Sequence, residues 1–251
     1  MKKSILVTGG ASGIGKSVAL EFAKNDYDVI ISDINEQDGS DLAQAENISF
    51  YPCDLSDAKA VKELSNKCLE QFTKIDILVN NAGFQHISPI DEFPEDMWEK
   101  MIHVLLTAPF LLTKYFFPEM KNQKWGRIIN VGSVHSQVAS PYKAAYISAK
   151  HGLVGLTKTT AIEGGPYNIT ANVICPAYVQ TPLVDKQIQA QAKTRGIKEE
   201  EVIKEVFLKN SVNNEIIQPD EVSDLIFYLA SDKAKSITGS CLNIDSGWIA
   251  Q

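Results

Sequence analysis

Short apolar runs alternate along the chain with longer segments in which apolar residues recur at helical spacing. The runs are rich in β-branched residues, and several are continuous, which is typical of strands covered on both faces. They predict strands at Ser4–Thr8, Asp28–Ser32, Ile48–Tyr51, Ile75–Asn80, Arg127–Val131, Ile169–Cys175 and Cys241–Ile244. The intervening segments predict helices at Ile14–Lys24, Asp57–Phe72, Pro94–Lys121, Ala144–Glu163 and Pro219–Ala230.

The alternation of strands and helices predicts an α/β fold, a Rossmann-type doubly wound parallel sheet with helices on both faces. A chain of 251 residues, 44% of them hydrophobic, is sufficient for one core, so we expect a single domain over 1–251. The stretch 180–214 breaks the alternation, because it is polar and has no strand. Since such sheets bind ligands at the carboxyl ends of their strands, we interpret it as a helical substrate lid. A solvated surface excursion is the alternative.

Composition restricts the partners. A net charge of −7, without a run of Lys or Arg, argues against nucleic acid. The most apolar region, Met101–Phe117, contains His103, Thr107 and Pro109, whereas a membrane span needs about 20 uninterrupted apolar residues. The N-terminus has too short an apolar stretch for a signal peptide, so we expect a cytoplasmic protein without a membrane partner. The four cysteines lack a C-x-x-C pair, which predicts buried free thiols and no metal site.

A glycine-rich turn, Thr8-Gly9-Gly10-Ala11-Ser12-Gly13-Ile14-Gly15, joins the first predicted strand to the first helix. Its glycines permit close backbone approach to a pyrophosphate, and the helix N-terminus adds free N–H groups and a positive dipole end. Asp33, at the end of the second strand, suits the ribose hydroxyls of the adenosine and would repel a 2′-phosphate. No Arg or Lys replaces Ser12 to offset that repulsion, so the pattern predicts NAD(H) rather than NADP(H). A glycine triplet alone can also be an ordinary turn.

Two further strand ends fit the same pocket. Asp54-Leu55 follows the third strand, where a side chain can cap the adenine, and Asn80-Asn81-Ala82-Gly83 follows the fourth. Asn, Asp and Gly also favour ordinary turns at strand ends. Taken alone, each segment is therefore better explained as a turn.

Three residues form a candidate catalytic group. Ser133 lies just past the fifth strand, and Tyr146 and Lys150 are four apart on one face of the next helix. A free phenol has a pKa of about 10, and a neighbouring ammonium lowers that pKa by favouring the phenolate. The serine hydroxyl can donate to an oxygen on which charge develops. The group suits proton transfer beside a hydride carrier, although Tyr-x-x-x-Lys is also common on exposed helices.

In order and spacing, these motifs resemble the short-chain dehydrogenase/reductase family, and the resemblance runs from Ser4 to the C-terminus. The motifs are Thr8–Gly15, Asn80–Gly83, Ser133, Tyr146-x-x-x-Lys150 and Pro176-x-x-Val179-x-Thr181. The resemblance implies a seven-stranded doubly wound sheet, with Tyr146 as general acid/base and Ser133 and Lys150 as its catalytic partners. It also implies that Lys150 binds the nicotinamide ribose, that Thr181 contacts the carboxamide, and that Pro176 and Val179 belong to the cofactor site.

Two positions depart from the family pattern. The family usually places Asn on the helix after the fourth strand, where it helps to hold a proton-relay water, and this chain has Leu105. The proton relay must therefore use another group to hold its water, or the turnover rate is lower. The second departure is milder, because Pro176-Ala177 stands where the family usually has Pro-Gly.

Further polar residues surround the candidate catalytic group. Gln85 and His135 follow strand ends that flank it, Lys143 shares the helix face of Tyr146, and Gln187 lies in the predicted lid. A lysine with amide and imidazole donors suits charge-assisted hydrogen bonds to a small carboxylate. A solvated surface lysine and a satisfied loop histidine are the alternatives.

Longer strings resemble a branch of the family, the D-3-hydroxybutyrate dehydrogenases. They are Gly83–Ile90, Trp125–Asn130, Ser133–His135, Lys143–Tyr146, Thr181–Val184, Lys186–Ile188 and Gly247–Gln251. By this resemblance a small hydroxy or keto acid is the substrate, and its carboxylate is held by Gln85, His135, Lys143 and Gln187. The resemblance also implies a homotetramer in which Trp248 closes a neighbouring subunit's pocket. Tyr178 stands where that branch more often has Trp.

The resemblance implies the reaction (R)-3-hydroxybutyrate + NAD⁺ → acetoacetate + NADH + H⁺. The nearest alternative is another NAD(H)-dependent member of the family acting on a β-ketoacyl thioester, a polyol or another small secondary alcohol. Asp33 and the acidic composition argue against the thioester. A non-catalytic NAD(H)-binding homologue is the alternative of a different class. Leu105 favours it, whereas Ser133, Tyr146 and Lys150 argue against it.

Overall fold

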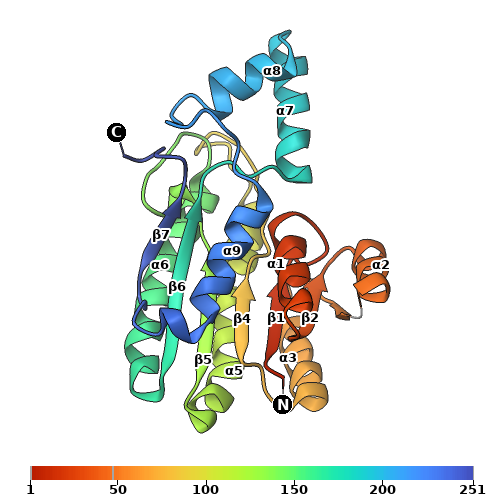
Figure 1. Ribbon diagram of the computed structural model, residues 1–251. Coiled ribbons are helices and arrows are strands. Elements are labelled where there is room, and N and C mark those ends of the chain that lie inside the picture. The colour runs from red at the N-terminus through yellow and green to blue at the C-terminus, as the bar shows by residue number, and fades with distance from the viewer. Residues whose placement is uncertain (1, 47, 251) are drawn as a thin grey trace.

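The computed structural model describes residues 2–46 and 48–250, without the side chains of residues 183, 186, 190, 191, 194 and 195. Over these residues, one parallel sheet runs in the order β3-β2-β1-β4-β5-β6-β7 (Figure 1). Its strands are β1 (Ser4–Thr8), β2 (Asp28–Asp33), β3 (Ser49–Pro52), β4 (Ile77–Asn80), β5 (Gly126–Val131), β6 (Ile169–Pro176) and β7 (Cys241–Ile244). The predicted fold class is confirmed. The strand order reverses between β1 and β4, which is where such sheets bind ligands.

Helices cover both faces of the sheet, and each layer has its own apolar core. On one face Val18 and Phe22 of α1 pack with Ile226 of α9. On the other face Leu64 of α3 packs with Phe116 of α5. The main helices are α1 (Gly13–Lys24), α2 (Glu36–Glu46), α3 (Ala58–Phe72), α4 (Glu95–Ile102), α5 (Ala108–Gln123), α6 (Ala144–Gly164) and α9 (Pro219–Ala230). Short 3₁₀ turns are η2 (Val134–Ser136), η3 (Gly165–Tyr167) and η5 (Asp232–Ala234).

Helix α2 was not predicted, because its sequence is polar and lacks an apolar stripe. Local capping and one close packing contact explain it instead. The side chain of Asn35 accepts a hydrogen bond from the backbone N–H of Asp38 at the start of the helix. Gly39 lies so close to Phe50 that a Cβ there would approach the ring to 2.3 Å. The glycine thus lets a helix with few apolar residues pack on the sheet edge.

The segment predicted as one helix over Pro94–Lys121 is divided. Helix α4 leads into the π-helix η1 (His103–Thr107), and α5 follows. The helical run Glu95–Gln123 is long and apolar enough for a membrane span by length and composition alone, and 44% of its most apolar window is buried inside the protein. In this structure, Leu112, Phe116 and Met120 of this run belong to the core beneath the sheet.

The polar insertion is helical, as predicted. It contains α7 (Pro182–Arg195), α8 (Glu199–Val202) and the π-helix η4 (Ile203–Phe207), which lie beyond the carboxyl ends of the strands (Figure 1). Its buried residues form a separate apolar cluster of Val184, Ile188, Ala192, Val202 and Phe207. The two ends of the insertion are joined, because the N–H of Gln180 donates to the carbonyl of Ile217 at 2.8 Å. In return, Ile217 donates to the carbonyl of Tyr178 at 3.2 Å.

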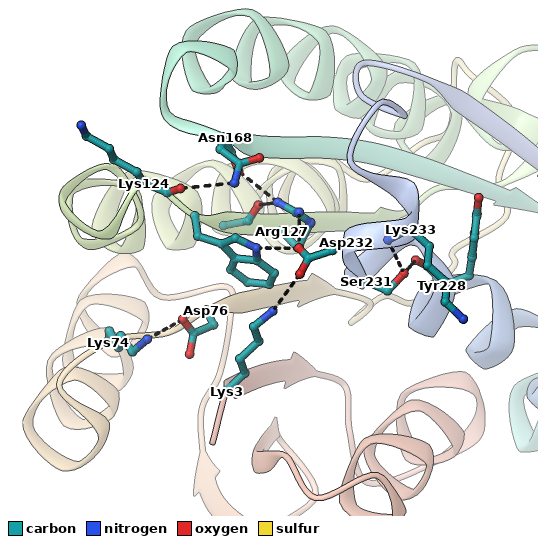
Figure 2. A network of polar contacts seen from close by, with 12 residues as sticks. Lys3, Lys74, Asp76, Lys124, Arg127, Asn168, Tyr228, Ser231, Asp232 and Lys233 are labelled. Carbon is teal, nitrogen blue, oxygen red and sulfur yellow. Dashed lines mark hydrogen bonds and ion pairs between the residues drawn. The ribbon is translucent and has the colours of Figure 1, made fainter. Parts of the chain in front are cut away.

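A polar network closes the opposite end of the sheet (Figure 2). The guanidinium of Arg127 is 0% exposed and donates to the carbonyls of Gly126 and Asn168. It also pairs with Asp232 at 3.2 Å and lies over the ring of Trp125. The indole N–H of Trp125 donates to the same carboxylate at 2.9 Å. The network fixes the start of β5 without reaching the carboxyl ends of the strands.

The thiols are free, and three of the four, Cys53, Cys68 and Cys175, are buried as predicted. Cys241 is partly exposed, because it begins the edge strand β7. Among the residues that the structure describes, no three His, Cys, Asp or Glu side chains gather closely enough to hold a metal ion.

Candidate active site

A cavity of about 550 Å³ opens at the carboxyl ends of the strands, beneath the insertion. The residues assigned above to catalysis, substrate or cofactor that line it are Gly9, Ser12, Gly13, Ile14, Asp33, Asp54, Leu55, Asn81, Ala82, Gly83, Gln85, Ser133, His135, Lys143, Tyr146, Lys150, Pro176, Val179, Thr181, Gln187 and Trp248. Five residues of the family motifs do not line it: Thr8, Gly10, Ala11, Gly15 and Asn80. Gly15 lies behind the turn, where a Cβ would come within 2.1 Å of the carbonyl oxygen of Gly9. Gly15 is therefore needed for packing of the turn.

The glycine turn presents an open helix N-terminus to this cavity. Gly9 and Gly13 have positive φ angles of 64° and 53°, which glycine adopts without strain. Ser12 is the N-cap of α1, but its hydroxyl caps no backbone N–H, and the first turn contains no acidic residue. The N–H groups at this helix start are therefore available to an anion, and the dipole favours one. The geometry fits a pyrophosphate.

Asp33 is held in place at the edge of the cavity. One carboxylate oxygen accepts the N–H of Ala11 at 3.1 Å, and the other accepts the N–H of Asn35 at 3.0 Å. No Lys, Arg or His in the described part of the chain forms an ion pair with it. A fixed carboxylate without a cationic partner suits neutral hydroxyl groups and disfavours a phosphate.

The end of β4 is tied to the glycine turn. The side-chain amide of Asn81 donates to the carbonyls of Thr8 and Gly9 at 2.9 and 3.1 Å. The hydroxyl of Thr8 accepts the backbone N–H groups of Asn81 and Ala82. Asn81 thus uses its amide donors within the protein, and it shapes the cofactor pocket through the turn. Nearby, hydrogen bonds from Ser56 lower the pKa of Asp54.

Ser133, Tyr146 and Lys150 come together in the lining of the cavity. The hydroxyl of Ser133 accepts the backbone N–H of His135 at 3.2 Å, which fixes the serine side chain at the end of β5. The ammonium of Lys150 donates to the carbonyl of Val131 at 2.6 Å, and burial lowers its pKa to about 8. The predicted grouping is therefore formed by β5 and by one face of α6.

The expected tuning of Tyr146 by Lys150 is not what this structure contains. Burial raises the pKa of Tyr146, and the opposing effect comes from its hydrogen bond with Ser133. The ammonium of Lys150 lies 5.6 Å from the centre of the tyrosine ring and bonds to the backbone instead. Without ligands, Tyr146 is thus a protonated phenol at neutral pH, which is the form that donates a proton to a ketone.

Beside the catalytic group lies a cation, Lys143, that forms no ion pair with any carboxylate among the described residues. The ammonium of Lys143 is 3.2 Å from Nε2 of His135, and the hydroxyl of Ser140 is 3.3 Å from the same nitrogen. Burial lowers the pKa of Lys143, and burial together with the Lys143 charge lowers that of His135 to about 4. His135 is 5% exposed, and its Nδ1 has no partner among the described residues. Neither a solvated lysine nor a satisfied loop histidine describes this pair.

Trp248 lies in the cavity of its own chain. Its ring meets that of His135 edge-on at 6.0 Å, and His135 in turn lies 6.3 Å from the ring of Tyr146. Within the single chain the C-terminal turn brings the indole to its own site, and the implied role in a neighbouring subunit's pocket stays a prediction. The hydrogen bonds from Gly247 and Ile249 to the buried carboxylate of Asp245 hold that turn.

Leu105, at the position where the family usually has Asn, is buried against Met101 and Ala149. It lies in the π-helix η1 and cannot bind a water through its side chain. Pro109 follows four residues later and has no N–H, so it cannot donate to the Leu105 carbonyl as an α-helix would require. The polar group that position 105 offers is therefore the backbone carbonyl of Leu105.

Comparison with known proteins identifies the family. The short chain dehydrogenase family model matches residues 3–192. The chain belongs to this family. A relative 43% identical over the full length of both proteins is an uncharacterized oxidoreductase, YxjF, of Bacillus subtilis. The D-beta-hydroxybutyrate dehydrogenase of Rhizobium meliloti is 41% identical, again over the full length of both.

A solved structure supports the same assignment. A variant of the actinorhodin polyketide ketoreductase, crystallised with NADPH, is 26% identical with a TM-score of 0.92. The match covers 98% of this short-chain dehydrogenase and 97% of that chain. A nicotinamide dinucleotide is therefore the cofactor class. In this chain, the open helix N-terminus after Ser12 would hold its pyrophosphate and Asp33 would face its adenosine ribose.

The cavity of this short-chain dehydrogenase also includes residues that the sequence did not single out. Ile34, Phe84, Val104, Val131 and Val184 supply apolar surface, and Lys100 supplies a cation. A signal existed for Phe84 and Ile34, since each directly follows a predicted site residue. Lys100 and Val104 come from the α4–η1 run, where a helical pattern does not indicate which turn reaches the sheet edge.

Proposed function

We propose that this short-chain dehydrogenase interconverts (R)-3-hydroxybutyrate and acetoacetate with NAD⁺ as hydride acceptor. The observation that supports this substrate is the position of the Lys143 ammonium. It faces the cavity beside Tyr146 and has no carboxylate partner among the described residues. A half-buried cation without a counter-charge favours an anionic ligand, and a carboxylate forms charge-assisted hydrogen bonds with it. The 41% identity to a D-beta-hydroxybutyrate dehydrogenase supports the same substrate.

In the proposed reaction the chain's own residues bind the acid and move one proton. Lys143 holds the carboxylate, which directs the C3 hydroxyl toward Tyr146 and Ser133. NAD⁺ supplies a nicotinamide that accepts the C3 hydride. The oxygen of Tyr146 takes the hydroxyl proton during oxidation and returns it during reduction. Ser133 donates a hydrogen bond to the substrate oxygen as its charge changes. The ammonium of Lys150 donates to the carbonyl of Val131 beside this group.

The preference for NAD⁺ over NADP⁺ rests on Asp33. Its carboxylate is fixed by two backbone N–H groups and has no cation to neutralise it among the described residues. A 2′-phosphate would approach this charge without compensation, whereas ribose hydroxyls donate to it. We therefore propose NAD(H) as the cofactor, although the solved relative was crystallised with NADPH.

One assay tests these proposals together. The NADH absorbance band is followed with (R)-3-hydroxybutyrate, its S enantiomer, a 3-hydroxybutyryl thioester and a polyol, each with NAD⁺ and with NADP⁺. We expect the highest kcat/KM for (R)-3-hydroxybutyrate with NAD⁺. A higher value for the thioester or the polyol contradicts the proposed substrate, and a higher value with NADP⁺ contradicts the proposed cofactor. Absence of turnover with every compound would support a non-catalytic dinucleotide-binding protein.

We also propose that the protein is a homotetramer. Phe110 of α5 and Ile162 of α6 are exposed, the latter at 79%, on the helices that flank the sheet. Burial of such apolar side chains between copies favours association. Sedimentation velocity of the wild type gives the assembly mass directly, and a monomer contradicts this proposal.

A further inference from the structure

Tyr178 is a second phenol in the cavity. It follows β6 and lines the same space as Tyr146. Its ring packs on that of Phe207 with the centroids 4.4 Å apart, and Phe207 is buried in the apolar cluster of the insertion. The aromatic contact therefore fixes the direction of the Tyr178 side chain between the strand end and the insertion.

The hydroxyl of Tyr178 has no partner in the described part of the protein. No hydrogen bond from this hydroxyl to another of these residues is found, and the half-buried side chain lines the cavity. Burial raises the pKa of Tyr178, so the hydroxyl keeps its proton at neutral pH and offers one donor and two lone pairs. An apolar ligand group placed against it would leave the hydroxyl without a hydrogen bond, which costs free energy.

The two polar ends of the cavity come from different segments. Lys143 and His135 belong to the chain between β5 and α6, whereas Tyr178 belongs to the chain between β6 and α7. The ring of Tyr146 lies 6.3 Å from that of His135, and both Tyr146 and Tyr178 line the cavity. An acid whose carboxylate binds Lys143 and whose C3 oxygen binds Tyr146 leaves its far carbon against the rest of the lining, where Tyr178 supplies a hydroxyl group.

We propose that Tyr178 selects 3-hydroxy acids that carry a hydroxyl group on C4, with 3,4-dihydroxybutyrate as the simplest, over the unsubstituted acid. This inference rests on the proposed function, because it uses the same carboxylate site and the same hydride transfer. In the reaction, C3 loses a hydride to the nicotinamide of NAD⁺, and its hydroxyl proton leaves through Tyr146. The products are 4-hydroxy-3-oxobutyrate, NADH and one proton. The C4 hydroxyl does not react and exchanges a hydrogen bond with Tyr178.

The test is a ratio of kcat/KM values. The value for 3,4-dihydroxybutyrate is divided by that for 3-hydroxybutyrate, with the same spatial arrangement at C3, for the wild type, Tyr178→Phe and Tyr228→Phe. Tyr228 is a matched control, because it is an exposed phenol on α9 and does not line the cavity. We expect a wild-type ratio above one, a ratio about tenfold lower in Tyr178→Phe, and no change in Tyr228→Phe.

The ratio separates hydrogen bonding from a structural role, since a loosened insertion would lower both kcat/KM values together. Tyr178→Trp provides a second variant that keeps an aromatic ring on Phe207 and should also lower the ratio. Equal ratios in the wild type and in Tyr178→Phe overturn the role of Tyr178 and leave the proposed function standing. Failure of the wild type to oxidise either acid overturns both.

Discussion

The ammonium nitrogen of Lys143 lies 3.2 Å from Nε2 of His135, so the histidine accepts a hydrogen bond from a cation. This contact requires that Nε2 carry no proton, which agrees with the pKa of His135 at about 4. The proton of the neutral ring is then on Nδ1, a buried atom without a partner in the described residues. The pair therefore presents a positive charge close to Tyr146, whereas the Nδ1–H of His135 stays buried.

Replacing Lys143 by Met removes the positive charge and keeps most of the apolar stem. We expect the KM for 3-hydroxybutyrate to rise about 30-fold, since a charge-assisted hydrogen bond is worth about 2 kcal/mol. Oxidation of a small neutral alcohol such as 2-butanol should change little. Lys158→Met is the matched control, because Lys158 is an exposed lysine on α6, the helix that begins after Lys143. An unchanged KM in Lys143→Met contradicts the assignment of the carboxylate site.

Replacing Tyr146 by Phe removes the group that transfers the proton. We expect kcat to fall by about 10²- to 10⁴-fold, the usual contribution of a general acid or base. The affinity for NADH, measured by fluorescence titration, should stay within about threefold, because the substitution leaves the glycine turn and Asp33 in place. Wild-type kcat in this variant would exclude Tyr146 as the proton donor.

Replacing Asp33 by Ala removes the charge that opposes a 2′-phosphate. We expect kcat/KM with NAD⁺ to fall and that with NADP⁺ to rise, so that their ratio drops by about 10- to 100-fold, or about 1.4 to 2.8 kcal/mol. Asp41→Ala on α2 serves as a control, because Asp41 is exposed and does not line the cavity. A ratio that is the same in both variants shows that another group sets the cofactor preference.

Acid should destabilise the protein partly through His135. Its pKa is about 4 in the folded protein and about 6.5 when unfolded, so the unfolded chain binds a proton first as the pH falls. The stability that the neutral ring contributes is complete above about pH 6.5 and is lost progressively between about pH 6.5 and 4. We expect the melting temperature of wild type to fall more steeply over this range than that of His135→Asn. His151→Asn, at an exposed site on α6, should follow the wild type.

Replacing Asp232 by Ala should reduce stability and leave catalysis intact. The carboxylate is the acidic partner of Arg127, a fully buried guanidinium, and its loss leaves that charge uncompensated (Figure 2). Because the carboxylate itself is 71% exposed and therefore screened, we expect the free energy of unfolding to fall by about 1–3 kcal/mol. Urea denaturation measures this loss, with Asp224→Ala as an exposed control on α9. A large fall in kcat would show that the two ends of the sheet are coupled.

The sequence predicts this fold well because strands buried on both faces leave continuous apolar runs. Ile5–Val7 and Ile128–Ile129 are examples, and both lie in strands. Helix α2 was missed because it depends on the Asn35 cap and on the contact of Gly39 with Phe50, neither of which gives a periodic pattern. The π-helix η1 was missed for a related reason, since one extra residue in a turn does not change the apolar periodicity.

The site was predictable where chemistry follows a strand end, as for Asp33 and Ser133, which both line the cavity. Spacing alone did not give the actual partner of Lys150. An i, i+4 relation places it on the face of Tyr146, yet its ammonium bonds to the carbonyl of Val131. Trp248 shows the same limit, because only the tertiary structure reveals that the C-terminal turn reaches its own His135. Rotamers and long-range packing decide such contacts, and neither is encoded in local spacing.

The backbone hydrogen bonds between Gln180, Tyr178 and Ile217 have an evolutionary consequence. They bring the entry and exit of the insertion to one point at the rim of the sheet, and the segment between them carries its own apolar cluster. The insertion can therefore change in length and composition without altering the pairing of the strands. A fold whose insertion is joined at one point of the sheet rim can accommodate a different substrate when that insertion alone is replaced.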